Sequence, residues 1–323
     1  MRTLVLSAAL ISAACTPPPP APEGLDDSTT YVFRNFYEDD DVFEAGIQGF
    51  MDWFNEDGIN LVGERATVDN TEAFTIGDLR PIDVEHLPLA DEIVIRRRSG
   101  NREDELAPRD LSRAKGVVSL AEMDCTWKEA EALLVRPDQD FVFAGDWEGY
   151  TREYLTSRAT FEDATQAEVF DPIRDGLKPF EDGFDGDRYA RSLLLTNNMA
   201  DPTRVLTSNI EEYLLELHLR HGVFDIDGEP TGVLAIKTYN REAAWGSAGN
   251  AALLQSFSIE LNIARPGDKT LRMLAVWAEP WESSGAIQPD SAFALNFAVN
   301  KSLDSSDRIS AICAGEIEVP PEP

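Results

Sequence analysis

The sequence predicts an α+β fold, in which a mixed helix and strand region precedes an antiparallel β-meander towards the C-terminus. Apolar residues at helical spacing between Phe43 and Phe54 indicate an amphipathic helix. Alternating apolar and polar residues at 254 to 263 indicate a half-buried strand. Turn residues at 265 to 269 then lead into an apolar run at 271 to 277, so these segments form a hairpin. A β-sandwich or a small barrel would accommodate the same strands.

Helix signals in the first half of the chain are specific. The residues from Asn55 to Gly58 end the amphipathic helix. Thr126 and Glu129 have the spacing of a capping box, so we expect a helix from there to about residue 134. The other segments are expected to be strands at 60 to 69, 91 to 98 and 116 to 124, an exposed loop at 99 to 114, a broken helix at 152 to 180 and a turn at 182 to 187.

The second half of the chain indicates strands joined by short turns, as in an antiparallel sheet with one solvated face. Segment 210 to 221 fits two structures, because His218 and His221 take opposite faces of a strand but share a helix face, where they could ligate a metal. Turn residues at 227 to 230 favour the strand, so we predict no metal site. Further strands are expected at 232 to 239, 293 to 299 and 308 to 318.

Composition and charge restrict the class of function. The chain has 323 residues, of which 43% are hydrophobic, enough for one large domain or two ordinary ones. It carries 28 basic and 59 acidic residues, and its formal net charge is −31. Such a charge repels phosphate backbones, so the body has no nucleic-acid partner.

The first 14 residues have the pattern of a signal peptide. Arg2 supplies a positive start, a mostly apolar run extends from Thr3 to Ala14, and small residues precede Cys15. The run is shorter than the roughly 20 residues needed to span a bilayer, so we expect export rather than a transmembrane helix.

The segment Ser12-Ala13-Ala14-Cys15 resembles the lipobox of bacterial lipoproteins. The resemblance implies that Cys15 is lipidated, becomes the first mature residue and anchors the protein to the cell envelope. Thr16 after the cysteine implies the outer membrane, with the protein facing the periplasm or the cell surface. The sequence departs from the family at Ser12, where an aliphatic residue is usual. The alternative is an ordinary signal peptide that leaves Cys15 unmodified and the protein secreted.

A proline tract separates this N-terminus from the body of the protein. Residues 17 to 22 favour an extended polyproline II spacer, which would hold the body away from the membrane. The chain therefore divides into a signal peptide at 1 to 14, an anchor and linker at 15 to 29, a mixed helix and strand region at 30 to 115, an α+β region at 116 to 318 and a tail at 319 to 323.

The sequence contains no recognisable catalytic motif. It lacks a nucleophile elbow, a glycine-rich phosphate loop and a Cys-x-x-Cys pair, so we assign no catalytic residue and no cofactor, and we favour a non-catalytic protein. One loop has the residue types of a glycan site, with an indole that can stack on a sugar ring and carboxylates that can bind its hydroxyl groups. A turn whose aromatic residues fold back onto the core is the favoured interpretation of this loop. Its residues are Asp146, Trp147, Glu148 and Tyr150.

Cys125 and Cys313 remain once Cys15 is assigned to the anchor. Export brings them to an oxidising compartment, where such a pair can form a disulfide. Two separate buried thiols are the alternative. The sequence leaves both open, because it does not place the two Cα atoms within the roughly 4.4 to 6.8 Å that a disulfide needs.

The order of elements from 116 to 318 is a strand, a capped helix and a later antiparallel meander, and it resembles the START-type helix-grip fold. The resemblance implies a curved sheet that grips a long helix around a cavity for lipid or another apolar ligand. We expect any ligand site on the sheet of residues 203 to 318. Three functions remain: a lipid-anchored envelope protein that binds a ligand or partner, which we rank first, a hydrolase of envelope glycans, and a structural envelope component.

Overall fold

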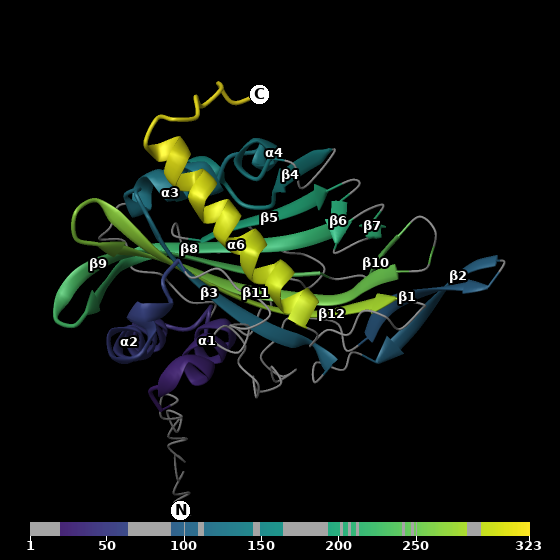
Figure 1. Ribbon diagram of the computed structural model, residues 1–323, viewed down its shortest axis with the longest axis horizontal. Coiled ribbons are helices and arrows are strands. Elements are labelled where there is room, and N and C mark those ends of the chain that lie inside the picture. The colour runs from purple at the N-terminus through teal and green to yellow at the C-terminus, as the bar shows by residue number, and fades with distance from the viewer. Residues whose placement is uncertain are drawn as a thin grey trace, which may run out of the picture.

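The fold combines helices with an antiparallel sheet of eight strands, which confirms the predicted α+β class (Figure 1). In the part of the chain that is described, no helix has the length and apolar character needed to cross a membrane. The computed structural model describes residues 20–63, 92–99, 101–108, 113–144, 149–163, 193–200, 203–205, 208–210, 213–240, 243–246, 249, 251–282 and 292–323.

Two N-terminal helices precede the sheet. Helix α1 covers Gly24–Arg34, helix α2 covers Asp40–Glu56, and the short 3-10 helix η1 covers Gly58–Leu61. Helix α2 confirms the predicted amphipathic helix, because its apolar side is buried as far as Phe54. The strand expected at 60 to 69 is wrong where it overlaps η1, and its residues after 63 lie outside the described part.

A separate hairpin follows in the chain. Strand β1 (Glu92–Ser99) confirms the strand expected at 91 to 98, and it pairs antiparallel with β2 (Asn101–Pro108). The loop expected at 99 to 114 is therefore wrong over the length of β2. Charged residues suggested a loop, but the ladder with β1 pairs the backbone groups of β2 whatever its side chains are.

Five of the eight strands of the main sheet confirm predicted strands, namely β3, β8, β9, β11 and β12. One hairpin joins β8 to β9 and another joins β11 to β12. At the β8–β9 turn, Asp227 and Gly228 have φ of 55° and 79°, as a two-residue turn between twisted strands requires. The strands are β3 (Lys115–Met123), β4 (Tyr150–Tyr154), β5 (Leu193–Ala200), β8 (Tyr213–Ile226), β9 (Glu229–Tyr239), β10 (Ala244–Trp245), β11 (Ala251–Arg265) and β12 (Lys269–Glu282), and β6 (Thr203–Val205) pairs with β7 (Ser208–Ile210) apart from this sheet.

Three short helices and one long helix complete the described fold. Helix α3 (Trp127–Leu134) begins at the predicted capping box, which is confirmed by both of its hydrogen bonds. Helices α4 (Gln139–Val142) and α5 (Arg158–Glu162) flank β4. The broken helix expected at 152 to 180 is thus wrong where it overlaps β4 and agrees with the structure at α5. Its part from 164 onward and the turn expected at 182 to 187 lie outside the described residues.

The C-terminal helix α6 (Ala292–Cys313) corrects two predictions. The strands expected at 293 to 299 and within 308 to 318 are one helix, which ends at Cys313 before a turn. Alternation of small and large apolar residues suggested strands, but Val299 and Leu303 lie one helical turn apart and are both buried against β3.

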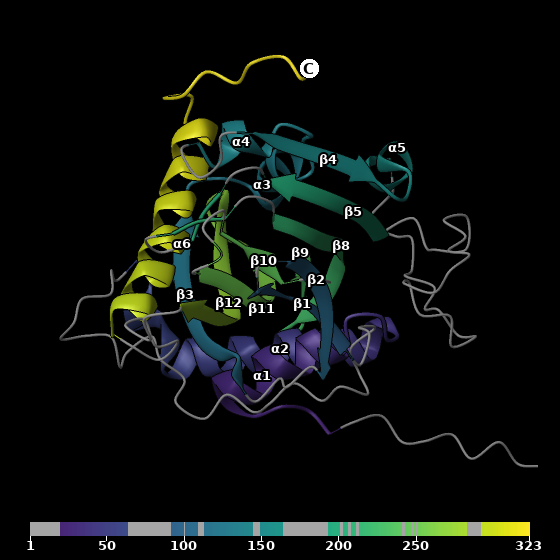
Figure 2. The same ribbon diagram turned by 90° about the vertical axis from the view of Figure 1, so that its right-hand side faces the viewer.

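The sheet has two covered sides. Its strand order is β3-β12-β11-β9-β8-β5-β4, and Figure 2 shows it curving, with α6 and α3 on one side and α1 and α2 on the other. We call the first side the inner face and the second the outer face. From β3 to α6 the chain runs through two helices, seven further main-sheet strands and the long helix, with α5 and the β6–β7 pair inserted among those strands. This order agrees with the strand, capped helix and antiparallel meander expected from the sequence. The largest apolar cluster lies on the outer face, between the sheet and helices α1 and α2.

Candidate functional site

Strand β11 separates an apolar core from a polar interior. Side chains alternate between the two sides of a strand, so four of its residues face α1 and four face α6. The sequence suggested that the polar side is solvated, but α6 covers that side and no residue of either set is more than 8% exposed. The outer set is Phe257, Ile259, Leu261 and Ile263, and the inner set is Ser256, Ser258, Glu260 and Asn262.

Arg272 of β12 is the centre of the polar interior. Its guanidinium donates from Nε and Nη2 to the two oxygens of Glu260, at 2.8 and 2.9 Å. Its Nη1 donates to Ser305 Oγ at 2.6 Å and to Ser306 Oγ at 2.9 Å, and both serines belong to α6. Arg272 is 3% exposed and Glu260 is 7% exposed. This buried ion pair therefore joins the inner face of the sheet to the long helix.

Hydroxyl and amide groups extend the polar interior along the sheet. The hydroxyl groups of Thr238 and Ser258 lie 2.5 Å apart on neighbouring strands. Asn262 donates to Glu260 at 2.9 Å, while its own buried Oδ1 has no hydrogen-bond partner in the described part of the chain. Groups of this kind both donate and accept, so the inner face can bind polar groups of a ligand.

Apolar side chains flank these polar groups and are partly exposed. Leu217 of β8 and Val276 of β12 keep part of their surface accessible, as do Leu215 and Leu274, each two residues away on the same strand. The strand register places Leu217, Thr238, Ser258 and Val276 in one row across the inner face. The row is apolar at both ends and carries hydroxyl groups in its middle. This arrangement can bind a molecule that has an apolar body and a few polar groups.

Two buried cations of the outer face hold the N-terminal helices. Lys237 donates to the carbonyl of Phe33 near the end of α1 at 3.0 Å, and burial lowers the pKa of its ammonium group to about 7. Arg220 donates to the carbonyl of Phe36 at 2.8 Å and to Asp40 at 2.7 Å, and burial lowers its pKa to about 10 although Asp40 opposes the shift. Both cations bind carbonyl groups in the last turn of α1 or just after it, so they dock helices rather than perform chemistry.

The two histidines of β8 lie on opposite faces, as predicted for a strand. His218 bonds to the hydroxyl of Tyr37 on the outer face. On the inner face, Nδ1 of His221 lies 2.6 Å from Oε2 of Glu131. The other carboxylate oxygen of Glu131 binds Lys128. Among the described residues, the one group able to hold a metal is Cys125, Glu129 and Cys313, but its two sulfur atoms are bonded to each other.

Of the four residues considered for a glycan site, the structure describes Tyr150 alone. Its hydroxyl donates to Asn198 on β5, and burial raises the pKa of Tyr150 to about 12. Tyr150 is thus part of the sheet rather than of an open platform. Asp146, Trp147 and Glu148 lie outside the described residues, as does Cys15.

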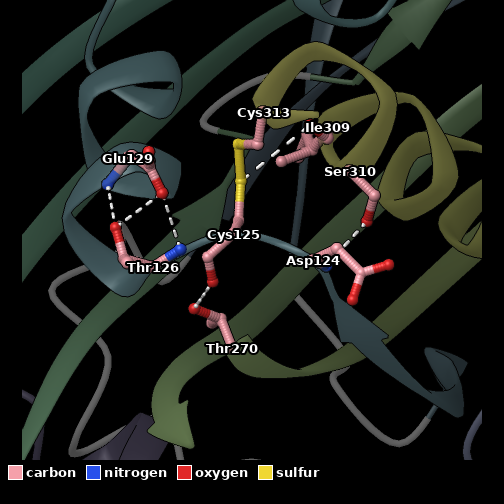
Figure 3. The surroundings of a disulfide bond; sticks show 8 residues. All are labelled: Asp124, Cys125, Thr126, Glu129, Thr270, Ile309, Ser310 and Cys313. Carbon is pink, nitrogen blue, oxygen red and sulfur yellow. Dashed lines mark hydrogen bonds between the residues drawn. A yellow bond between two sulfur atoms is a disulfide. The ribbon is translucent and has the colours of Figure 1, made fainter. Parts of the chain in front are cut away.

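Cys125 and Cys313 form a disulfide with a Cα–Cα distance of 5.5 Å, inside the range that the sequence left open (Figure 3). Cys125 lies between β3 and the capping box of α3, and Cys313 is the last residue of α6. The carbonyl of Cys125 also accepts a 2.8 Å hydrogen bond from Thr270 of β12 (Figure 3). The disulfide therefore fixes the C-terminal end of α6 to the end of the sheet.

No family model matches this chain, and no curated protein matches it. Among solved structures, the Zhui aromatase/cyclase from Streptomyces sp. R1128 is similar with a TM-score of 0.32 and 9% identity, over 64% of this chain and 97% of that one. The human StarD13 (DLC2) lipid transfer and protein localization domain is similar with a TM-score of 0.31 and 9% identity, over 67% and 87% of the two chains. At these scores the likenesses support no argument about function.

Proposed function

We propose that this protein is a non-catalytic binding protein that takes a small ligand against the inner face of its sheet, beside α6. The ligand has an apolar body and carries hydroxyl or amide groups. The observation that carries this proposal is the row of Leu217, Thr238, Ser258 and Val276, in which partly exposed apolar side chains border a pair of hydroxyl groups.

The alternation in β11 supports the same proposal. A protein core is normally filled with apolar side chains, because a polar group that loses water without a partner costs about 1 to 3 kcal/mol. The outer face follows this rule, whereas the inner face places Ser256, Ser258, Glu260 and Asn262 under a helix. A polar ligand group would supply the partner that Asn262 Oδ1 lacks among the described residues.

The proposal includes the cell envelope as the place of action. It rests on the lipobox resemblance of Ser12-Ala13-Ala14-Cys15, with the proline tract as spacer. In the native host, the wild-type protein should sediment with membranes and the Cys15→Ser variant should not. An intact mass that shows an unmodified Cys15 in the mature wild-type protein would remove the anchor from the proposal and leave the ligand site unaffected.

Ligand binding is tested with N-phenylnaphthylamine, a neutral apolar probe that carries one N–H group and fluoresces when it leaves water. Leu217→Trp and Val276→Trp fill the inner face at its two apolar ends, and Ile59→Trp adds the same indole at a site that is 56% exposed and remote from that face. Equal unfolding midpoints would show that the variants are folded.

The wild-type protein and Ile59→Trp should bind the probe with the same affinity. The two inner-face variants should bind it at least about tenfold more weakly, since filling the site removes more than about 1.4 kcal/mol of contact. Equal binding by all four proteins, or no binding by the wild type, would contradict the proposal.

A further inference from the structure

Two indole rings form a platform at the other end of the sheet, on its outer side. Trp245 of β10 and Trp281 of β12 are both register partners of Ala252, so their rings flank an alanine side chain of β11. The ring centroids are 5.4 Å apart and the planes make an angle of 60°. Trp281 is 36% exposed and is one of three large apolar residues in the described part with so much exposed surface.

The platform lies beyond the cover of α1. Trp277 lies four residues before Trp281, on the same side of β12. Its ring packs against Phe33 of α1, with the ring centroids 5.9 Å apart. Trp281 is four residues further along the strand, which corresponds to about 13 Å. The apolar core therefore explains the position of Trp277 but not that of Trp281.

Polar groups border the platform. Glu279 stands between Trp277 and Trp281 on the same side of β12, and it accepts a hydrogen bond of 2.6 Å from Gln255. Its carboxylate also lies 2.6 Å from Nη2 of Arg113, a side chain that is 61% exposed. Glu279 is only 4% exposed, so a fixed carboxylate holds an accessible guanidinium beside the rings.

The backbone of β11 is irregular at the same point. The register with β12 shifts between Leu253 and Gln255, which is a β-bulge, and such bulges redirect side chains next to binding sites. The buried Nε1 of Trp245 has no hydrogen-bond partner in the described part of the chain. An indole N–H that is removed from water costs free energy unless something accepts its hydrogen bond.

We propose that this platform is a second binding site, and that its ligand is an oligosaccharide. A pyranose ring presents C–H groups on its faces and hydroxyl groups around its edge. The faces match the exposed indole of Trp281, and the edge matches the accessible donors of Arg113. A purely apolar ligand would make no use of the accessible guanidinium beside the rings. The site is separate from the inner face, which lies on the other side of the sheet.

Isothermal titration of the full-length protein with three probes, cellotetraose, chitotetraose and maltotetraose, tests this proposal. At least one probe should bind saturably to the wild type. Trp281→Ala should weaken that binding about tenfold or more, and Arg113→Met about threefold or more. Trp53→Phe is the matched control, because Trp53 lies on α2, away from the platform, and its substitution should leave the affinity unchanged.

Trp281 is exposed enough that its substitution should not unfold the protein, whereas Arg113→Met also leaves the buried Glu279 without its cation. Thermal unfolding of each variant therefore checks that it is folded at the temperature of the titration. Binding of N-phenylnaphthylamine to Trp281→Ala should equal that of the wild type, which separates this site from the inner face. The proposal is overturned if none of the three probes binds the wild type, or if Trp281→Ala binds as tightly as Trp53→Phe.

Discussion

Replacing Arg272 by methionine should destabilise the protein by about 3 to 5 kcal/mol, because it leaves a buried carboxylate without its cation. Glu260 is 7% exposed, and both of its oxygens accept hydrogen bonds from Arg272. The serines of α6 would each lose one hydrogen bond but keep another, since Ser305 and Ser306 also donate to the carbonyl of Ser302, at 2.7 and 3.1 Å. The expected loss is therefore dominated by the uncompensated charge.

The double variant Arg272→Met with Glu260→Met separates this charge from simple loss of contact. Removing both ions leaves no buried charge, so the double variant should recover most of the loss, and the coupling free energy between the two sites should be at least about 2 kcal/mol. Urea unfolding followed by tryptophan fluorescence measures each free energy, with unchanged slopes as the sign that the unfolding reaction is the same. The reasoning is refuted if the loss from Arg272→Met is below about 1 kcal/mol, or if the losses of the two single variants simply add.

Three other predictions concern stability. The variant Cys125→Ser with Cys313→Ser should lose up to about 5 kcal/mol, the chain-entropy limit for a sequence separation of 188, and an unchanged urea midpoint would count against this. The pKa of Lys237 is lowered to about 7 in the folded protein, against roughly 10.4 in the unfolded chain. Between these values the unfolded state binds more protons, so the free energy of unfolding should rise as pH increases from about 7 towards 10. Lys237→Met should flatten that rise in urea titrations. Gly232→Ala would place a Cβ 2.2 Å from Nε1 of Trp127, and a thermal midpoint equal to that of the wild type would contradict the expected cost of about 1 to 3 kcal/mol.

Local signals in the sequence predicted the elements that depend on local chemistry. The capping box at Thr126 and Glu129 and the hairpin turn at Asp227 act over a few residues, and both are present in the structure. Helix α6 was missed because its small and apolar residues alternate between Phe293 and Val299, which fits a strand as well as a helix. Its burial against β3 decides for the helix, and that contact joins residues far apart in the sequence.

The inner face was visible in the sequence, but its environment was not. The polar residues of β11 alternate with apolar ones, which is the usual pattern of a strand with one solvated side. Arg272 and α6 cover that side in the structure, and neither could be assigned to it from spacing. Lys237 had one local sign, a lysine within an otherwise apolar strand, but its partner at Phe33 comes from a helix about two hundred residues earlier.

Photolabelling with a fatty acid that carries a diazirine group in its chain tests the central claim most directly. The probe reacts where its apolar chain is bound, and peptide mass spectrometry then locates the modified residues. The inner-face site predicts labels on β8 and β12 around Leu217 and Val276, and their loss in Val276→Trp but not in Ile59→Trp. Labels confined to α1, α2 or the Trp245 and Trp281 platform would contradict a ligand site on the inner face.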